Sequence, residues 1–150
     1  MRHYVLDACA LIALLQDEAG ADKVAEAINA ANNGEATISM NKLNLLEVYY
    51  NAYRSLGREQ ADMMLAEFKK QPVIIHHEIS DEVFLEAGRL KATYKTSLAD
   101  SIALAEAAVA GGELLTADHH ELDVVEKNEE IQFYWIRLGT QSDTINRQNV

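Results

Sequence analysis

Acidic side chains end or interrupt apolar segments at four places along this chain, Asp7, Glu47, Asp100 and Asp118. If the fold gathers them, the four carboxylates repel one another strongly unless a cation lies between them. An all-oxygen set of ligands suits Mg²⁺ or Mn²⁺ rather than Zn²⁺. Such an ion lowers the pKa of a bound water and orients it for in-line attack on phosphorus. The four acids therefore indicate metal-dependent hydrolysis of a phosphodiester bond.

Three of these acids also have a purely structural explanation. Asp7 directly precedes an apolar helical segment, where Asp commonly caps the helix. Ser97 and Asp100 have the spacing of a capping box, with Asp in place of the usual Glu, and Asp118 and Glu121 repeat this spacing. The local sequence leaves both explanations open.

Glu47 has different alternatives. It shares one face of a predicted helix with the apolar residues Leu43, Leu46 and Tyr50. An ionised carboxylate on a stripe that faces the core requires a partner. Arg54, which lies on the same face, or another cationic side chain could be that partner, and a bound metal ion could serve equally well.

The elements that must position these acids alternate along the whole chain. Apolar and β-branched runs predict five strands, at residues 4–6, 36–39, 73–75, 113–116 and 131–136. Helical spacing of apolar residues predicts the helices between them, including residues 17–33, 41–55 and 58–70, with Ser39 as the cap of the second. This alternation predicts an α/β three-layer sandwich, with a mainly parallel sheet of four to five strands and helices on both faces. Asp7 and Asp118 then lie at the carboxyl edge of the sheet, where ligands bind, while Glu47 and Asp100 lie near helix starts.

The length and the charge restrict the class of protein. A chain of 150 residues with 49% hydrophobic content can form one good core, so we expect one domain at residues 1–138 and a disordered polar tail at residues 139–150. A net charge of −11 argues against general binding to phosphate backbones and suits a basic protein partner. The Tyr and Met residues in 41–70 either pack in the core or form an interaction surface.

The sequence also predicts a cytoplasmic location. A single cysteine, Cys9, excludes an intrachain disulfide and fits a reducing compartment. The first residues lack the features of a signal peptide, and no apolar stretch approaches the roughly 18 residues of a membrane span.

Four sequence segments occur in a specific order on this strand and helix pattern, namely VLDACALIALL, LNLLEV, SLADSIALAEAA and LLTADHHELD. Together they resemble a PIN domain over residues 1 to about 138, and the short chain resembles a VapC-type toxin ribonuclease of a toxin–antitoxin pair. The resemblance implies a Rossmann-like sheet and an endoribonuclease that uses Mg²⁺ or Mn²⁺ to cleave an RNA substrate. It also implies a homodimer and a cognate antitoxin, a protein whose cationic segment blocks the cleft.

The resemblance assigns catalysis and metal binding to the four acids, Asp7, Glu47, Asp100 and Asp118. It places Thr116 as a hydroxyl just before the last acid and Asp123 as a possible outer member of the cluster. Cys9 departs from the pattern, because many relatives carry Ser or Thr two residues after the first Asp.

Two other classes of protein compete with this interpretation. A catalytically silent PIN-like module would bind RNA or protein without cleavage, although the full acidic set disfavours it. A receiver-type phosphoacceptor would need paired acids beside the end of the first strand and a Lys at the end of a later one. Neither LLTAD nor VIIHH provides these residues.

Overall fold

A five-stranded parallel sheet forms the centre of the molecule, for which a computed structural model describes residues 1–139. The strand order is β3-β2-β1-β4-β5, and all four neighbouring pairs are parallel. The strands are β1 (Arg2–Leu6), β2 (Ala36–Asn41), β3 (Ile74–His76), β4 (Glu113–Thr116) and β5 (Gln132–Trp135). The predicted fold class is confirmed, while the predicted tail lies outside the described residues from residue 140 onward.

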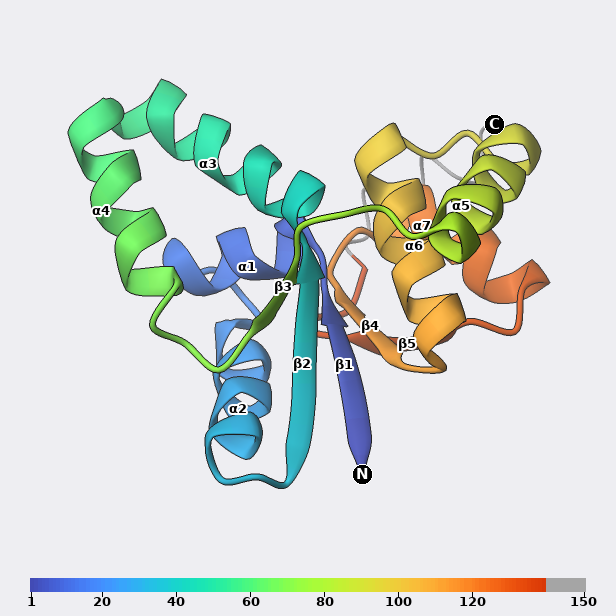
Figure 1. The fold of residues 1–150 in the computed structure, drawn as a ribbon, viewed down its shortest axis with the longest axis horizontal. Helices are drawn as coiled ribbons and strands as arrows, with labels where there is room; N and C mark the ends of the chain where they lie inside the picture. The colour runs from blue at the N-terminus through green and yellow to red at the C-terminus, as the bar shows by residue number, and fades with distance from the viewer. Residues whose placement is uncertain (140–150) are drawn as a thin grey trace.

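Helices cover both faces of this sheet (Figure 1). They are α1 (Ala8–Leu15), α2 (Ala21–Asn32), α3 (Lys42–Leu56), α4 (Arg58–Phe68), α5 (Asp81–Thr93), α6 (Leu98–Ala110) and α7 (His119–Asn128). In the region described, none of these helices is long and apolar enough to span a membrane.

The alternation of side chains along each strand creates two separate cores. Leu6 and Leu115 pack on one face with apolar residues of α1, α2 and α3. Val5 and Leu114, their neighbours in sequence, pack on the opposite face with α5, α6 and α7. Successive residues of a strand point to opposite faces, so a parallel sheet that is buried on both sides needs continuous apolar runs.

The start of α3 differs from the prediction. Strand β2 continues to Asn41, and Asn41 rather than Ser39 caps the helix, because its Oδ1 accepts a hydrogen bond of 2.9 Å from the N–H of Leu43. Ser39 is still part of the strand, and its hydroxyl lies 3.0 Å from Nε2 of His3 on β1. Helix α3 and helix α4 then project beyond the sheet as a pair (Figure 1).

Candidate metal site at the carboxyl edge of the sheet

Asp7 lies between β1 and α1 and is completely buried. Its Oδ1 accepts a hydrogen bond of 2.8 Å from the N–H of Ala10, so the predicted helix cap is present. The other oxygen, Oδ2, is buried without a hydrogen-bond partner among the residues that the structure describes. The cap therefore explains only one of the two carboxylate oxygens.

The surroundings of Asp7 favour its protonated form. Burial raises the pKa of Asp7 to about 7, while the Thr116 hydroxyl and the N–H of Ala10 oppose this rise. The negative charges of Asp118 and Glu47 raise the pKa further. Because a nearby cation would favour the ionised carboxylate, this position suits a ligand of a metal ion.

Asp118 and Glu121 enter the site from the first turn of α7. The Asp118 side chain caps α7 by accepting a hydrogen bond of 3.2 Å from the N–H of Glu121. The N–H of Asp118 donates to Oγ1 of Thr116 over 3.2 Å. The Thr116 hydroxyl at the end of β4 thus holds the backbone of Asp118 two residues later.

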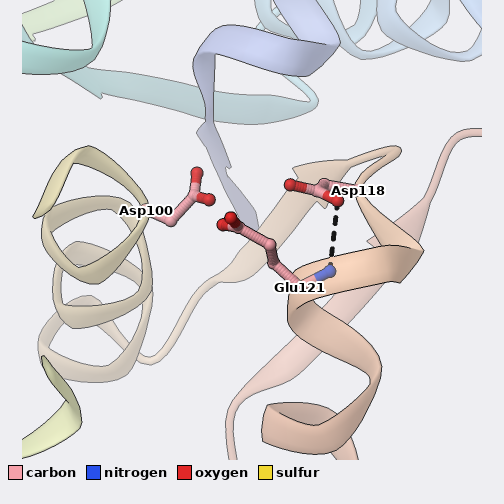
Figure 2. A group of neighbouring side chains, drawn as sticks. All are labelled: Asp100, Asp118 and Glu121. Carbon is pink, nitrogen blue, oxygen red and sulfur yellow. Dashed lines mark hydrogen bonds between the residues drawn. The ribbon is translucent and has the colours of Figure 1, made fainter. Parts of the chain in front are cut away.

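Asp100 reaches the same point from the first turn of α6. The Ser97 hydroxyl accepts a hydrogen bond of 3.1 Å from the N–H of Asp100, so Ser97 caps this helix. The Asp100 carboxylate points toward Asp118 and Glu121 (Figure 2). One carboxylate oxygen from each of these three residues lies within 4.8 Å of the other two. The main-chain N–H of Asp100 therefore takes part in the helix cap while its carboxylate belongs to the acidic cluster.

The crowding of carboxylates affects their protonation. Burial raises the pKa of Asp100 well above its usual range, and a hydrogen bond with Glu121 and the charges of Asp7, Glu121 and Asp118 raise it further. Two carboxyl groups that share a proton release it when a divalent cation takes its place. The three neighbouring oxygens and the unpartnered Oδ2 of Asp7 fit a small oxygen-preferring cation. The positive ends of α6 and α7 favour the ionised form of the carboxylates that would bind it.

Glu47 lies at the margin of this cluster, half-buried on α3. Burial raises the pKa of Glu47, and the charges of Glu121 and Asp118 act in the same direction. The three-carboxylate group of Figure 2 does not include Glu47. The fold thus brings Glu47 within electrostatic range of the cluster without placing it among the three closest acids.

The predicted apolar surroundings of Glu47 are confirmed at Leu43, which packs against the second core, but they were wrong at Leu46 and Tyr50. Leu46 and Tyr50, which we expected on a stripe facing the core, are 51% and 42% exposed. The guanidinium of Arg54, the predicted alternative partner, lies 5.3 Å from the centre of the Tyr50 ring. Helix α3 buries a neighbouring stripe instead, which consists of Asn44, Leu45 and Val48. Periodicity shows that a helix has an apolar face, but several of these apolar residues stay in solvent.

The structure also locates the two remaining predicted positions, Asp123 and Cys9. Asp123 lies one turn along α7, where its Oδ1 is 2.8 Å from Nδ1 of His119. Burial raises the pKa of the Cys9 thiol to about 12, and the charges of Asp7 and Asp118 contribute to this rise. Cys9 is therefore a neutral thiol beside the acids. Glu121 was missed as a site residue, because its spacing from Asp118 was explained fully by a helix cap.

Comparisons with known proteins agree with this fold. The sequence model of the PIN domain family matches residues 4–128, whereas a search of curated proteins gave no significant match. A chain in the structure of VapBC2 from Rickettsia felis, bound to a DNA fragment from its promoter, is 17% identical with a TM-score of 0.67, and the match covers 88% of this chain and 97% of that chain. A chain in the structure of VapBC-1 from nontypeable Haemophilus influenzae is also 17% identical, with a TM-score of 0.68. That match covers 89% of this chain and 98% of the other.

A third solved structure is VapC20 from Mycobacterium tuberculosis, a toxin that cleaves the sarcin-ricin loop, with 16% identity and a TM-score of 0.60. That match covers 83% of this chain and 95% of the toxin. At such identities the structural likeness establishes a shared fold, and the family match covers most of the chain. The chain belongs to the PIN domain family.

Proposed function

We propose that this protein is a metal-dependent endoribonuclease and the toxin of a type II toxin–antitoxin pair. The observation that carries the proposal is the convergence of Asp100, Asp118 and Glu121 within 4.8 Å of one another, beside the buried Asp7. This arrangement lies at the carboxyl edge of a parallel sheet, where α/β proteins bind their ligands. Membership of the PIN family and the fold shared with VapC structures support the same function.

The position of each acidic residue determines its proposed role in metal binding. Asp100, Asp118 and Glu121 would hold Mg²⁺ or Mn²⁺, with Asp7 behind them and Glu47 at the margin. A bound ion would supply an activated water and neutralise charge on the scissile phosphate. The amino ends of α6 and α7 begin at this site, and their positive dipole ends would favour a phosphate bound beside them. Without a cation, five nearby acids would repel RNA.

An antitoxin is the partner that the charge of this chain favours. The net charge of −11 and the acidic site would attract a cationic segment, and an Arg of that segment could take the place of the metal. A groove of about 1000 Å³ lies between α1, α2, α3 and α4 and includes Ile12, Val48 and Met64. We propose that the apolar face of an antitoxin helix occupies this groove. A matched structure from Klebsiella pneumoniae is a toxin–antitoxin complex, so a protein that shares this fold occurs with an antitoxin.

We also propose a homodimer. Large apolar side chains of α3 and α5 are exposed, in particular Leu46, Tyr50, Tyr53, Phe84 and Leu85. Contiguous exposed apolar patches commonly mark a protein interface, and we propose that these side chains form such an interface in the dimer. Light scattering of the purified protein should give twice the mass of the 150-residue chain, and a monomer at micromolar concentration would contradict this part of the proposal.

The decisive experiment is cleavage of single-stranded RNA by the purified protein. Mg²⁺ or Mn²⁺ should support cleavage, EDTA should stop it, and Asp100→Ala should abolish it. Asp81→Ala is a matched control, because Asp81 is an exposed acid in the first turn of α5. Undiminished cleavage in EDTA or by Asp100→Ala would refute the mechanism. Binding of RNA without cleavage under every condition would favour the silent PIN-like module.

A further inference from the structure

Two buried amide side chains connect α3 to α6, the helices that carry Glu47 and Asp100. Nδ2 of Asn44, a residue only 1% exposed, donates a hydrogen bond of 2.9 Å to the main-chain oxygen of Ala99. Ala99 directly precedes Asp100, and Asn44 lies one turn before Glu47 on α3. This bond therefore joins the two backbone segments from which these carboxylates project.

The second connection lies at the beginning of α3. Nδ2 of Asn41 donates a hydrogen bond of 2.8 Å to Oε1 of Glu106 on α6, while Oδ1 of Asn41 caps α3. The other oxygen of Glu106, Oε2, lies 3.0 Å from Nδ1 of His76 on β3. Glu106 is almost completely buried, so its carboxylate is held on both sides inside the protein.

One feature of Asn44 cannot be explained by stability. Its Oδ1 is buried and has no hydrogen-bond partner within residues 1–139. A buried acceptor without a partner costs stability, and an apolar side chain of similar size would avoid this cost. The polar side chain of Asn44 is therefore better explained by its one hydrogen bond, which joins α3 to Ala99 on α6, than by packing.

We propose that Asn41, Asn44 and Glu106 form a clamp that sets the position of α3 against α6. One hydrogen bond fixes a distance but leaves the helices free to rotate about it, whereas two bonds along α6 also restrict their crossing angle. The clamp thereby sets the separation of the Glu47 and Asp100 carboxylates in the acidic site. This inference rests on the proposed metal-dependent function, in which the three clamp residues are positioning residues rather than ligands.

The first test measures binding of Mn²⁺ alone by isothermal titration calorimetry. Asn44→Leu removes both the bond to Ala99 and the unpartnered oxygen, so it should leave the protein as stable as the parent while weakening Mn²⁺ binding roughly 10-fold or more. Asn128→Leu is the control, because its amide also bonds a main-chain oxygen, that of Val124, but within one exposed helix. Reduced stability of Asn44→Leu with parental Mn²⁺ affinity would reduce Asn44 to a structural role.

Glu106 offers a second pair of variants. Glu106→Gln keeps an oxygen that can accept from Asn41, so its Mn²⁺ affinity should stay within about 3-fold of the parent, whereas Glu106→Leu should lose roughly 10-fold or more. In RNA cleavage, Asn44→Leu and Glu106→Leu should lower kcat more than they change KM, because the RNA-binding surface is intact. Equal affinities for Glu106→Gln and Glu106→Leu would overturn the clamp.

A distance measurement separates failure of the clamp from failure of the proposed function. Spin labels at Leu56→Cys on α3 and Val109→Cys on α6, both in a Cys9→Ser background, report the arrangement of the two helices by double electron–electron resonance. The distance distribution should broaden in Asn44→Leu and stay narrow in Asn128→Leu. An unchanged distribution would overturn the clamp whatever the activity. A parent protein that neither binds Mn²⁺ nor cleaves RNA would overturn the proposed function even if the distribution broadens.

Discussion

Replacing Asp7 with Asn tests whether this buried carboxyl group stays protonated in the folded protein until a cation binds. Asn keeps an oxygen that can cap α1 through the N–H of Ala10 but cannot ionise. In the parent, burial raises the pKa of Asp7 from 3.8 to about 7 in the folded protein. The folded state therefore holds a proton that the unfolded chain releases, and the stability of the parent falls as the pH rises between these two values.

The size of the effect follows from this pKa difference. Between pH 5 and pH 8 the ionisation of Asp7 should remove up to about 2.5 kcal/mol from the free energy of unfolding of the parent, since one pKa unit corresponds to about 1.4 kcal/mol. Asp7→Asn does not lose this stability, because the Asn side chain cannot ionise. The variant should therefore gain stability relative to the parent as the pH rises, and the gap should stop growing once the pH exceeds the folded-state pKa.

The assay is urea unfolding in EDTA at pH 5 and pH 8, followed by circular dichroism and by the fluorescence of Trp135, which is the single tryptophan. Asp22→Asn, an exposed acid in the first turn of α2, serves as control and should show no such gap. Added Mn²⁺ should stabilise the parent at pH 8 and the Asn variant much less, because the ion binds only the folded site. A stability difference between parent and Asp7→Asn that is equal at both pH values would refute the reasoning.

Three further predictions concern the cluster and the backbone. In EDTA, Asp100→Asn should be at least as stable as the parent by urea unfolding yet gain less from Mg²⁺; a loss of stability with an unchanged metal response would reduce Asp100 to a helix residue without a role in the site. Glu121→Gln should weaken Mn²⁺ binding roughly 10-fold or more in calorimetry, and an unchanged affinity would remove Glu121 from the site. Gly20→Ala should cost about 2 kcal/mol or more of unfolding free energy, because its φ is +96° and the new Cβ would lie 2.6 Å from the main-chain oxygen of Ile136. Gly34→Ala has a positive φ but open space around it, so it should cost about 1 kcal/mol, and equal losses would show that the contact at Gly20 relaxes.

The order and type of the elements could be predicted because they depend on local patterns. Apolar runs such as Tyr4, Val5 and Leu6 are compatible with a strand buried on both faces, and the alternation with helical segments then requires parallel crossovers. The same logic placed Asp7 and Asp118 at strand ends, where the structure has them. Boundaries were less certain, as the cap at Asn41 shows, because Ser39 and Asn41 are both good capping residues.

The composition of the site depended on contacts between distant segments. Glu121 belongs to the closest group of carboxylates because the first turn of α7 faces that of α6, and the spacing of Glu121 from Asp118 carries no information about α6. Glu47 was expected among apolar neighbours, yet the exposure of Leu46 and Tyr50 depends on how far α3 projects beyond the sheet.

The sequence by itself determined a parallel α/β domain with acids at one edge, since strand and helix periods are properties of neighbouring residues. Only the tertiary structure decided which of those acids meet, how deeply Asp7 is buried and which amides tie α3 to α6. Burial and carboxylate separation depend on packing between elements that are tens of residues apart in the chain. Periodicity within one element cannot specify those distances, and the raised pKa values of Asp7 and Asp100 follow from them.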